Sequence, residues 1–200
     1  MSGAWIAIFL MVFIWSGAFP KDRFVWALEV APAMAAAVIL YATRKRFPLT
    51  RLAYILILIH SIILMVGGRY TYAEVPLFDW IRDIFHQSRN NYDKVGHFAQ
   101  GFIPAIIARE ILIRKGVVRV KNWLAFIVVS ICLAISAFYE LFEWLTAELT
   151  GEAAEAFLGT QGYAWDTQSD MFFALLGATA AIALLNRTHD RQLAALKNAK

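Results

Sequence analysis

One histidine and five carboxylates lie in three segments of the sequence, each beside or inside an apolar run. The segments are NYDKVGHFAQGF at 91–102, SAFYELFEW at 136–144 and WDTQSD at 165–170. Imidazole nitrogens and carboxylate oxygens are ligands that divalent cations accept, and such an ion can bind a phosphate headgroup or activate water for hydrolysis. The candidate metal ligands, of which three or four could act together, are His97, Glu140, Glu143, Asp166 and Asp170.

The composition is that of a membrane protein. Of the 200 residues 60% are hydrophobic and 17% charged, and the mean hydropathy is +0.56, whereas soluble domains carry about 25% charged residues. The length suits a single integral membrane domain over residues 1–200. The net charge of +4 comes from short basic clusters between apolar runs, so we expect the lipid bilayer as a partner and no nucleic acid.

Six apolar runs each approach the roughly 20 residues that a helix needs to cross a bilayer. Unpaired backbone amides are costly in lipid, so spanning segments of this kind must be helices. We therefore predict an all-α fold, a polytopic membrane helical bundle with six transmembrane helices. The first run has no basic residues before it, which predicts a retained helix rather than a removed signal peptide. The predicted spans are about 3–20, 24–43, 51–68, 95–113, 122–145 and 168–186.

The basic residues predict the orientation of these helices. Twelve of the nineteen Lys and Arg residues lie in 44–51, 114–121 and 187–200, and such segments stay in the cytoplasm. Both termini are therefore expected to be cytoplasmic, in the inner membrane of a bacterium. On the outer side, Leu77, Trp80 and Ile84 recur at helical spacing between charged residues, which predicts a short amphipathic interfacial helix near 77–88.

This topology brings the polar residues of three helix ends to the outer side of the membrane at similar depth. Together they would form an outward-facing pocket of histidine and carboxylate groups, in which His97 points into the bundle toward Glu140. Polar residues inside spans are costly and usually functional or paired. The further pocket candidates are Asp93, Lys94, Gln168, His60 and Glu29.

Several of these residues also have a purely structural explanation. Acids near a helix start, such as Asp93 and Asp166, interact favourably with the helix dipole by about 0.3–1 kcal/mol. A lone histidine such as His60 is more often a packing residue, and Glu29 can satisfy a donor near Pro32. The dipole disfavours Glu140 and Glu143 at the C-terminal part of their helix, so they need cations, protons or donors nearby.

The motifs YDKVGHFAQGF, SAFYELFEW and WDTQSDM resemble, in this order along the chain, the YjdF family of bacterial inner-membrane proteins. The resemblance covers nearly the whole chain. It implies an inner-membrane location and a multi-pass helical architecture rather than a particular reaction.

The chain is more loosely similar to VanZ-like membrane proteins, which are associated with teicoplanin resistance. The matching positions are Asp93, Lys94, His97, Phe98, Glu140, Asp170 and Gly177. Ala174 stands where those proteins tend to have Asn, and the Arg usual shortly before their Asp pair is missing. We therefore predict no antibiotic resistance from this similarity.

Four functions follow from these observations. The pocket could bind a lipid or envelope-precursor headgroup, with or without a divalent metal. It could instead be catalytic, as a hydrolase or transferase that acts on a lipid-linked substrate through His97, Glu140 and Glu143. The chain could instead transport an ion or small solute, although six spans show no repeated halves. In the fourth case the polar groups serve helix packing only. The sequence has no HExxH, Gly-x-Ser-x-Gly, Walker or Gly-x-Gly-x-x-Gly motif.

Overall fold

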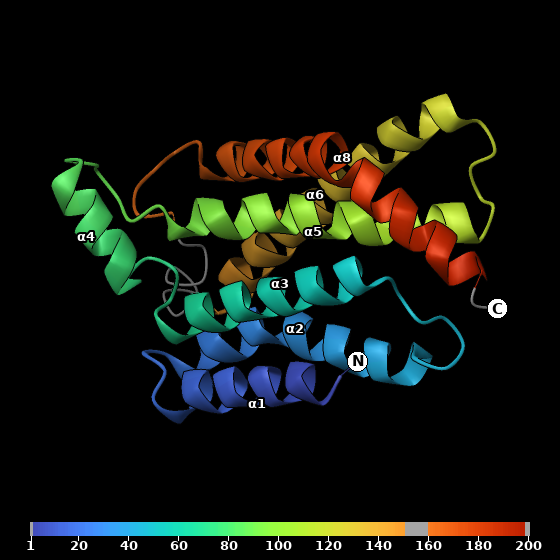
Figure 1. The fold of residues 1–200 in the computed structure, drawn as a ribbon. Helices are drawn as coiled ribbons and strands as arrows, with labels where there is room; N and C mark the ends of the chain where they lie inside the picture. Colours follow the sequence, from blue (N-terminus) through green and yellow to red (C-terminus); the bar gives the residue numbers. More distant parts are fainter. Residues whose placement is uncertain (1, 151–159, 199–200) are drawn as a thin grey trace.

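The computed structural model describes residues 2–150 and 160–198, and these residues form helices joined by loops, with no strand among them. The helices run side by side as a bundle, with α4 projecting at one end (Figure 1). Their bounds are α1 (Gly3–Ala18), α2 (Arg23–Thr43), α3 (Arg51–Arg69), α4 (Pro76–Ile84), α5 (Tyr92–Arg114), α6 (Lys121–Thr150) and α8 (Asp166–Asn198). The predicted all-α class is therefore confirmed.

Four of the described helices, α2, α3, α6 and α8, are long and apolar enough to cross a membrane. The apolar helix α1 has only 16 residues. In α5, the apolar run is interrupted by polar residues such as Gln100 and Arg109. The structure thus shows four of the six predicted spans by length and composition, and α1 and α5 lie alongside them in the same bundle (Figure 1).

Several helices extend further than the apolar runs predicted. Helix α5 starts at Tyr92 instead of 95, which puts Asp93 in its first turn. Helix α8 starts at Asp166 and continues to Asn198, well past the predicted end at 186. Hydropathy could not predict this extension because the added turns carry many polar residues. Helix α6 likewise continues to Thr150.

Helices α5 and α8 pack with their backbones in close contact. A Cβ atom on Gly101 of α5 would lie 1.8 Å from the carbonyl oxygen of Ala174, and one on Gly177 of α8 would lie 2.0 Å from that of Phe98. Small residues of this kind let membrane helices approach closely. The contact places the start of α5 beside the start of α8, where most of the predicted site residues lie.

Hydrogen bonds attach the segment before α5 to the segment before α8. The backbone N–H of Asn90 donates to the side chain of Gln161 at 3.0 Å, and that side chain donates back to the Asn90 carbonyl at 2.9 Å. The buried Asn90 amide also donates to the Val75 carbonyl, at 3.1 Å, and to Asp79 of α4, at 3.0 Å. These contacts fix the position of Arg89, the neighbouring residue.

A buried polar cluster at the other end of α5 is centred on Glu110, which is fully buried. Thr50 donates to its carboxylate through the backbone N–H, at 3.0 Å, and through the hydroxyl, at 2.7 Å. Arg114 donates at 2.6 Å, and the Nε2 of His189 lies 3.2 Å away. Because each carboxylate oxygen has partners, we interpret this cluster as a structural clamp between α3, α5 and α8.

Helix α4 agrees with the predicted amphipathic segment, although it ends at Ile84 rather than near 88. Its side chains Leu77 and Trp80 are about 60% exposed, like many large apolar side chains on the outside of the bundle. The helix stops where Phe85 caps it and His86 takes a positive φ of 52°. Exposed apolar groups next to charged ones suit a membrane interface.

Candidate functional site

Two buried cations join the acids at the starts of α5 and α8. The Nζ of Lys94 lies 2.7 Å from Asp166 and 2.6 Å from Asp170. The guanidinium of Arg89 lies 2.5 Å from Asp166 and 3.5 Å from Asp93. Arg89 is not among the site residues predicted from the sequence. The only sign of its role in the sequence is that Arg89 lies four residues before Asp93, about one helical turn away.

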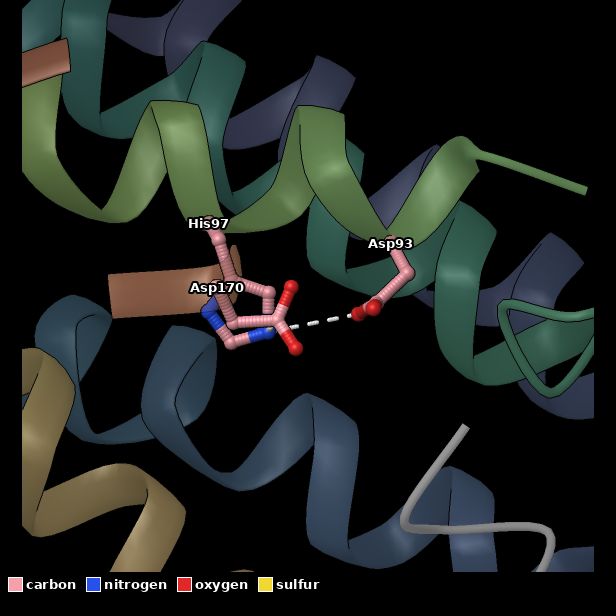
Figure 2. Close-up of side chains that lie close together, drawn as sticks. All are labelled: Asp93, His97 and Asp170. Atoms are coloured by element: carbon pink, nitrogen blue, oxygen red, sulfur yellow. Dashed lines mark ion pairs between the residues drawn. The ribbon is translucent and has the colours of Figure 1, made fainter. Parts of the chain in front are cut away.

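The imidazole of His97 lies among acceptors from three helices. Its Nε2 is 3.3 Å from Asp93 Oδ1 and 3.8 Å from Asp170 Oδ1 (Figure 2). Its Nδ1 is 3.1 Å from Gln100 Oε1 and 3.7 Å from Glu140 Oε1. The side chain is buried, so His97 faces the interior of the bundle on the side of Glu140, as expected.

One group within this set has the size of a metal site. Asp93, His97 and Asp170 each offer a ligand atom, and these atoms lie within 4.8 Å of one another. If Gln100 accepts a hydrogen bond from Nδ1–H of His97, the lone pair of Nε2 points toward the two carboxylates. Metal-binding histidines usually have their second nitrogen held in this way.

We call the buried groups at the meeting of α5, α6 and α8 the outer cluster, after the side of the membrane that the sequence predicts for them: Arg89, Asp93, Lys94, His97, Glu140, Asp166 and Asp170. It contains four carboxylates and two permanent cations. With His97 neutral and every carboxylate ionised, two negative charges are left over. Uncompensated buried charge is costly, so one divalent cation or two protons would balance the cluster.

The carboxylate of Glu140 has an unused oxygen pointing into this cluster. Its Oε1 is buried and has no hydrogen-bond partner among the described residues, and the side chain is 6% exposed. Buried polar atoms are nearly always hydrogen-bonded, and an exception calls for an explanation. An ion or ligand group bound beside His97 would supply the missing partner.

A cavity of about 280 Å³ adjoins the outer cluster, between α2, α3, α5 and α6. Asp93 and His97 line it, together with Glu143 of α6, Glu29 of α2 and His60 of α3. The hydroxyl of Tyr139 on α6 donates to Glu29 at 3.2 Å. Glu29 and His60, which are secondary candidates by sequence, therefore border the same space as His97.

Two predicted site residues, Gln168 and Asp166, are not part of the metal-sized group. Gln168 is exposed and does not line the cavity, and its place in the pocket stays a prediction. It lies two residues after Asp166, so the helical repeat turns it to the other face of α8. Asp166 is buried against Arg89 and Lys94 but is not part of the metal-sized group. The remaining candidates border the outer cluster, the cavity or both.

Comparison with known proteins agrees with the predicted resemblance. The model of a family described as predicted membrane protein (DUF2238) matches residues 1–191. The chain is 51% identical over 183 residues to the inner membrane protein YjdF of Escherichia coli (strain K12), covering 92% of this chain and 88% of that protein. No solved structure matches the chain. The protein therefore belongs to the DUF2238 family of membrane proteins, together with YjdF.

Proposed function

We propose that this protein binds a divalent cation at Asp93, His97 and Asp170 and uses it to hold a phosphate-bearing headgroup of a lipid or envelope precursor. The observation that carries the proposal is the position of the His97 imidazole. Its Nε2 faces two carboxylates, and its Nδ1 lies 3.1 Å from the oxygen of Gln100. A bound ion would act as a Lewis acid toward a phosphate oxygen.

The donor set suits a borderline metal ion. One imidazole nitrogen with carboxylate oxygens favours ions such as Zn²⁺ or Mn²⁺. Ligand atoms about 2.0–2.2 Å from one ion lie at most about 4.4 Å apart, so the observed limit of 4.8 Å needs only small side-chain rotations. The buried Oε1 of Glu140 lies 3.7 Å from Nδ1 of His97, the other ring nitrogen, so Glu140 is not one of the ligands that we propose.

We also propose that six helices span the inner membrane and that both termini face the cytoplasm. The start of α1 and the end of α8 lie at the end of the bundle opposite α4 (Figure 1). Most Lys and Arg residues belong to loops and tails at that end. The exposed apolar side chains of α4 then lie in the outer interface, and the outer cluster opens toward the outside.

Metal binding is tested on the purified full-length protein in detergent, by elemental analysis and titration with Zn²⁺ and Mn²⁺. We expect about one ion per chain, and at least tenfold weaker binding in His97→Gln and Asp170→Asn. The matched controls are His86→Gln and Asp83→Asn, which change exposed residues of the same types. Occupancy near zero in the wild type, or equal loss in the controls, would refute the metal site.

The headgroup is tested separately with glycerol phosphate as a soluble probe. Isothermal titration should detect binding to the metal-loaded protein and none after treatment with EDTA. Equal binding in the two states would show that the metal does not hold the phosphate.

A further inference from the structure

The cavity beside the outer cluster is polar at one end and apolar at the other. Glu29 and Glu143 line it at the end of the bundle near α4. Further along the helices, toward the opposite end, its walls are formed by side chains such as Ile57, Ile107 and Ala36. A space with this division fits an amphiphile, with the headgroup at the acids and a hydrocarbon chain along the apolar walls.

Two buried acids line the polar end of the cavity. Glu29 and Glu143 are 5% and 7% exposed, and no Lys or Arg of the described residues pairs with either. Tyr139 donates to Glu29, whereas none of the described residues donates to Glu143. Two buried acids that pair with no lysine or arginine of the described residues call for protons or for a positively charged ligand.

Two prolines in the cavity wall add further acceptors. Pro32 of α2 and Pro104 of α5 both line the cavity. Proline has no N–H, so the carbonyls one turn earlier, at Leu28 and Gln100, lose their helical hydrogen bonds, and of these two residues Gln100 lines the cavity. A ligand that donates several hydrogen bonds suits this wall better than one that accepts them.

Helices α2 and α6 lie on two sides of the cavity. Helix α2 packs on α3, and α6 packs on α5 and α8, whereas α2 and α6 are not among the closely packed pairs of described helices. Both nevertheless line the cavity. The hydrogen bond from Tyr139 to Glu29 bridges this seam at 3.2 Å, and its opening would admit a chain from the side.

We infer that the cavity binds an amphiphile with a primary ammonium group, which lies between Glu29 and Glu143 and enters between α2 and α6. A primary ammonium offers three N–H donors, which match the two acids and the carbonyl of Gln100. An anionic headgroup would meet carboxylates instead, and a bare inorganic cation would leave the apolar walls unexplained. The inference goes beyond the metal centre and does not depend on it.

The test places the full-length protein in nanodiscs of phosphatidylethanolamine, phosphatidylcholine and phosphatidylglycerol in equal amounts. Native mass spectrometry then reports which lipid stays bound. We expect about a tenfold preference for phosphatidylethanolamine over each of the others, the ratio that 1.4 kcal/mol represents. Equal retention of the three lipids would overturn the inference. Retention of phosphatidylcholine, whose amine has no N–H, at the same level as phosphatidylethanolamine would also overturn it.

Variants show whether the acids cause the preference. The isosteric double variant Glu29→Gln, Glu143→Gln should lower the ratio to about one, because amides carry no charge. Glu148→Gln changes an exposed acid on α6, the helix of Glu143, and should keep the preference. A preference that survives in the double variant would overturn the inference.

Filling the apolar part provides an independent test. Ala36→Phe places a ring in the cavity, and Ala35→Phe makes the same change at the neighbouring exposed position. Only Ala36→Phe should abolish lipid retention, and equal effects of the two would contradict the proposed site.

Asp170→Asn should lose the metal and keep the lipid preference, because Asp170 does not line the cavity. Failure of the metal centre and failure of the lipid site are therefore distinguishable.

Discussion

The ammonium of Lys94 on α5 lies 2.6 Å from Oδ1 of Asp170 on α8, and both side chains are more than 90% buried. The same ammonium lies 2.7 Å from Asp166. This contact joins two helices that are far apart in the sequence. It also holds Asp170 beside His97, at 3.8 Å, so one lysine orients part of the proposed metal site.

Replacing this lysine should destabilise the protein. Lys94→Met leaves two buried carboxylates with one cation fewer, and the free energy of unfolding should fall by about 3 kcal/mol. Lys21→Met is the control, because Lys21 pairs with Glu74 at the surface with its side chain 47% exposed, and such pairs contribute about 0–1 kcal/mol. Thermal unfolding in detergent measures both, and equal losses would contradict the buried ion pair.

The close contact of α5 and α8 should not tolerate a methyl group. In Gly177→Ala the new Cβ would lie 2.0 Å from the Phe98 carbonyl oxygen, so the helices must separate. We expect the free energy of unfolding to fall by about 2 kcal/mol and metal affinity to decrease with it. Gly3→Ala, where a Cβ meets nothing within 4 Å, should leave both unchanged. A fully stable, metal-binding Gly177→Ala protein would show that the contact is looser.

The side chain of Gln100 should tune metal affinity without being a ligand. Gln100→Leu removes the acceptor 3.1 Å from Nδ1 of His97, and the ring then loses the contact that orients it. Loss of such supporting contacts typically lowers metal affinity by about 10–100-fold. Titration with Zn²⁺ measures the change, and Gln168→Leu at an exposed position is the matched control. Unchanged affinity in Gln100→Leu would mean that His97 is oriented in another way.

The orientation in the membrane can be measured with single cysteines. Ser88 and Thr188 are exposed and lie near opposite ends of the bundle, whereas the native Cys132 is fully buried. A membrane-impermeant maleimide should label Ser88→Cys in right-side-out vesicles and Thr188→Cys only in inverted ones. The wild type should remain unlabelled in both. The opposite labelling pattern would reverse the proposed topology.

Much of the fold could be predicted from the sequence. Helix formation depends on contacts between residues three or four apart and on apolar length, so the helices were expected near their observed positions. The ends were less predictable. Helix α8 continues through polar residues to Asn198 because the fully buried His189 contacts Glu110 of α5, a partner 79 residues away.

The sequence by itself determined the membrane class, the helices and the gathering of acids around His97 at one end of the bundle. Only the tertiary structure decided which side chains meet. It brought Arg89 into the cluster, turned Gln168 outward and placed Glu29 beside Glu143 at a cavity. The physical reason is that pairing depends on how each helix is rotated and how closely it packs. Contacts such as that of Gly177 with Phe98 set these quantities, and they are properties of two helices together rather than of either sequence segment alone.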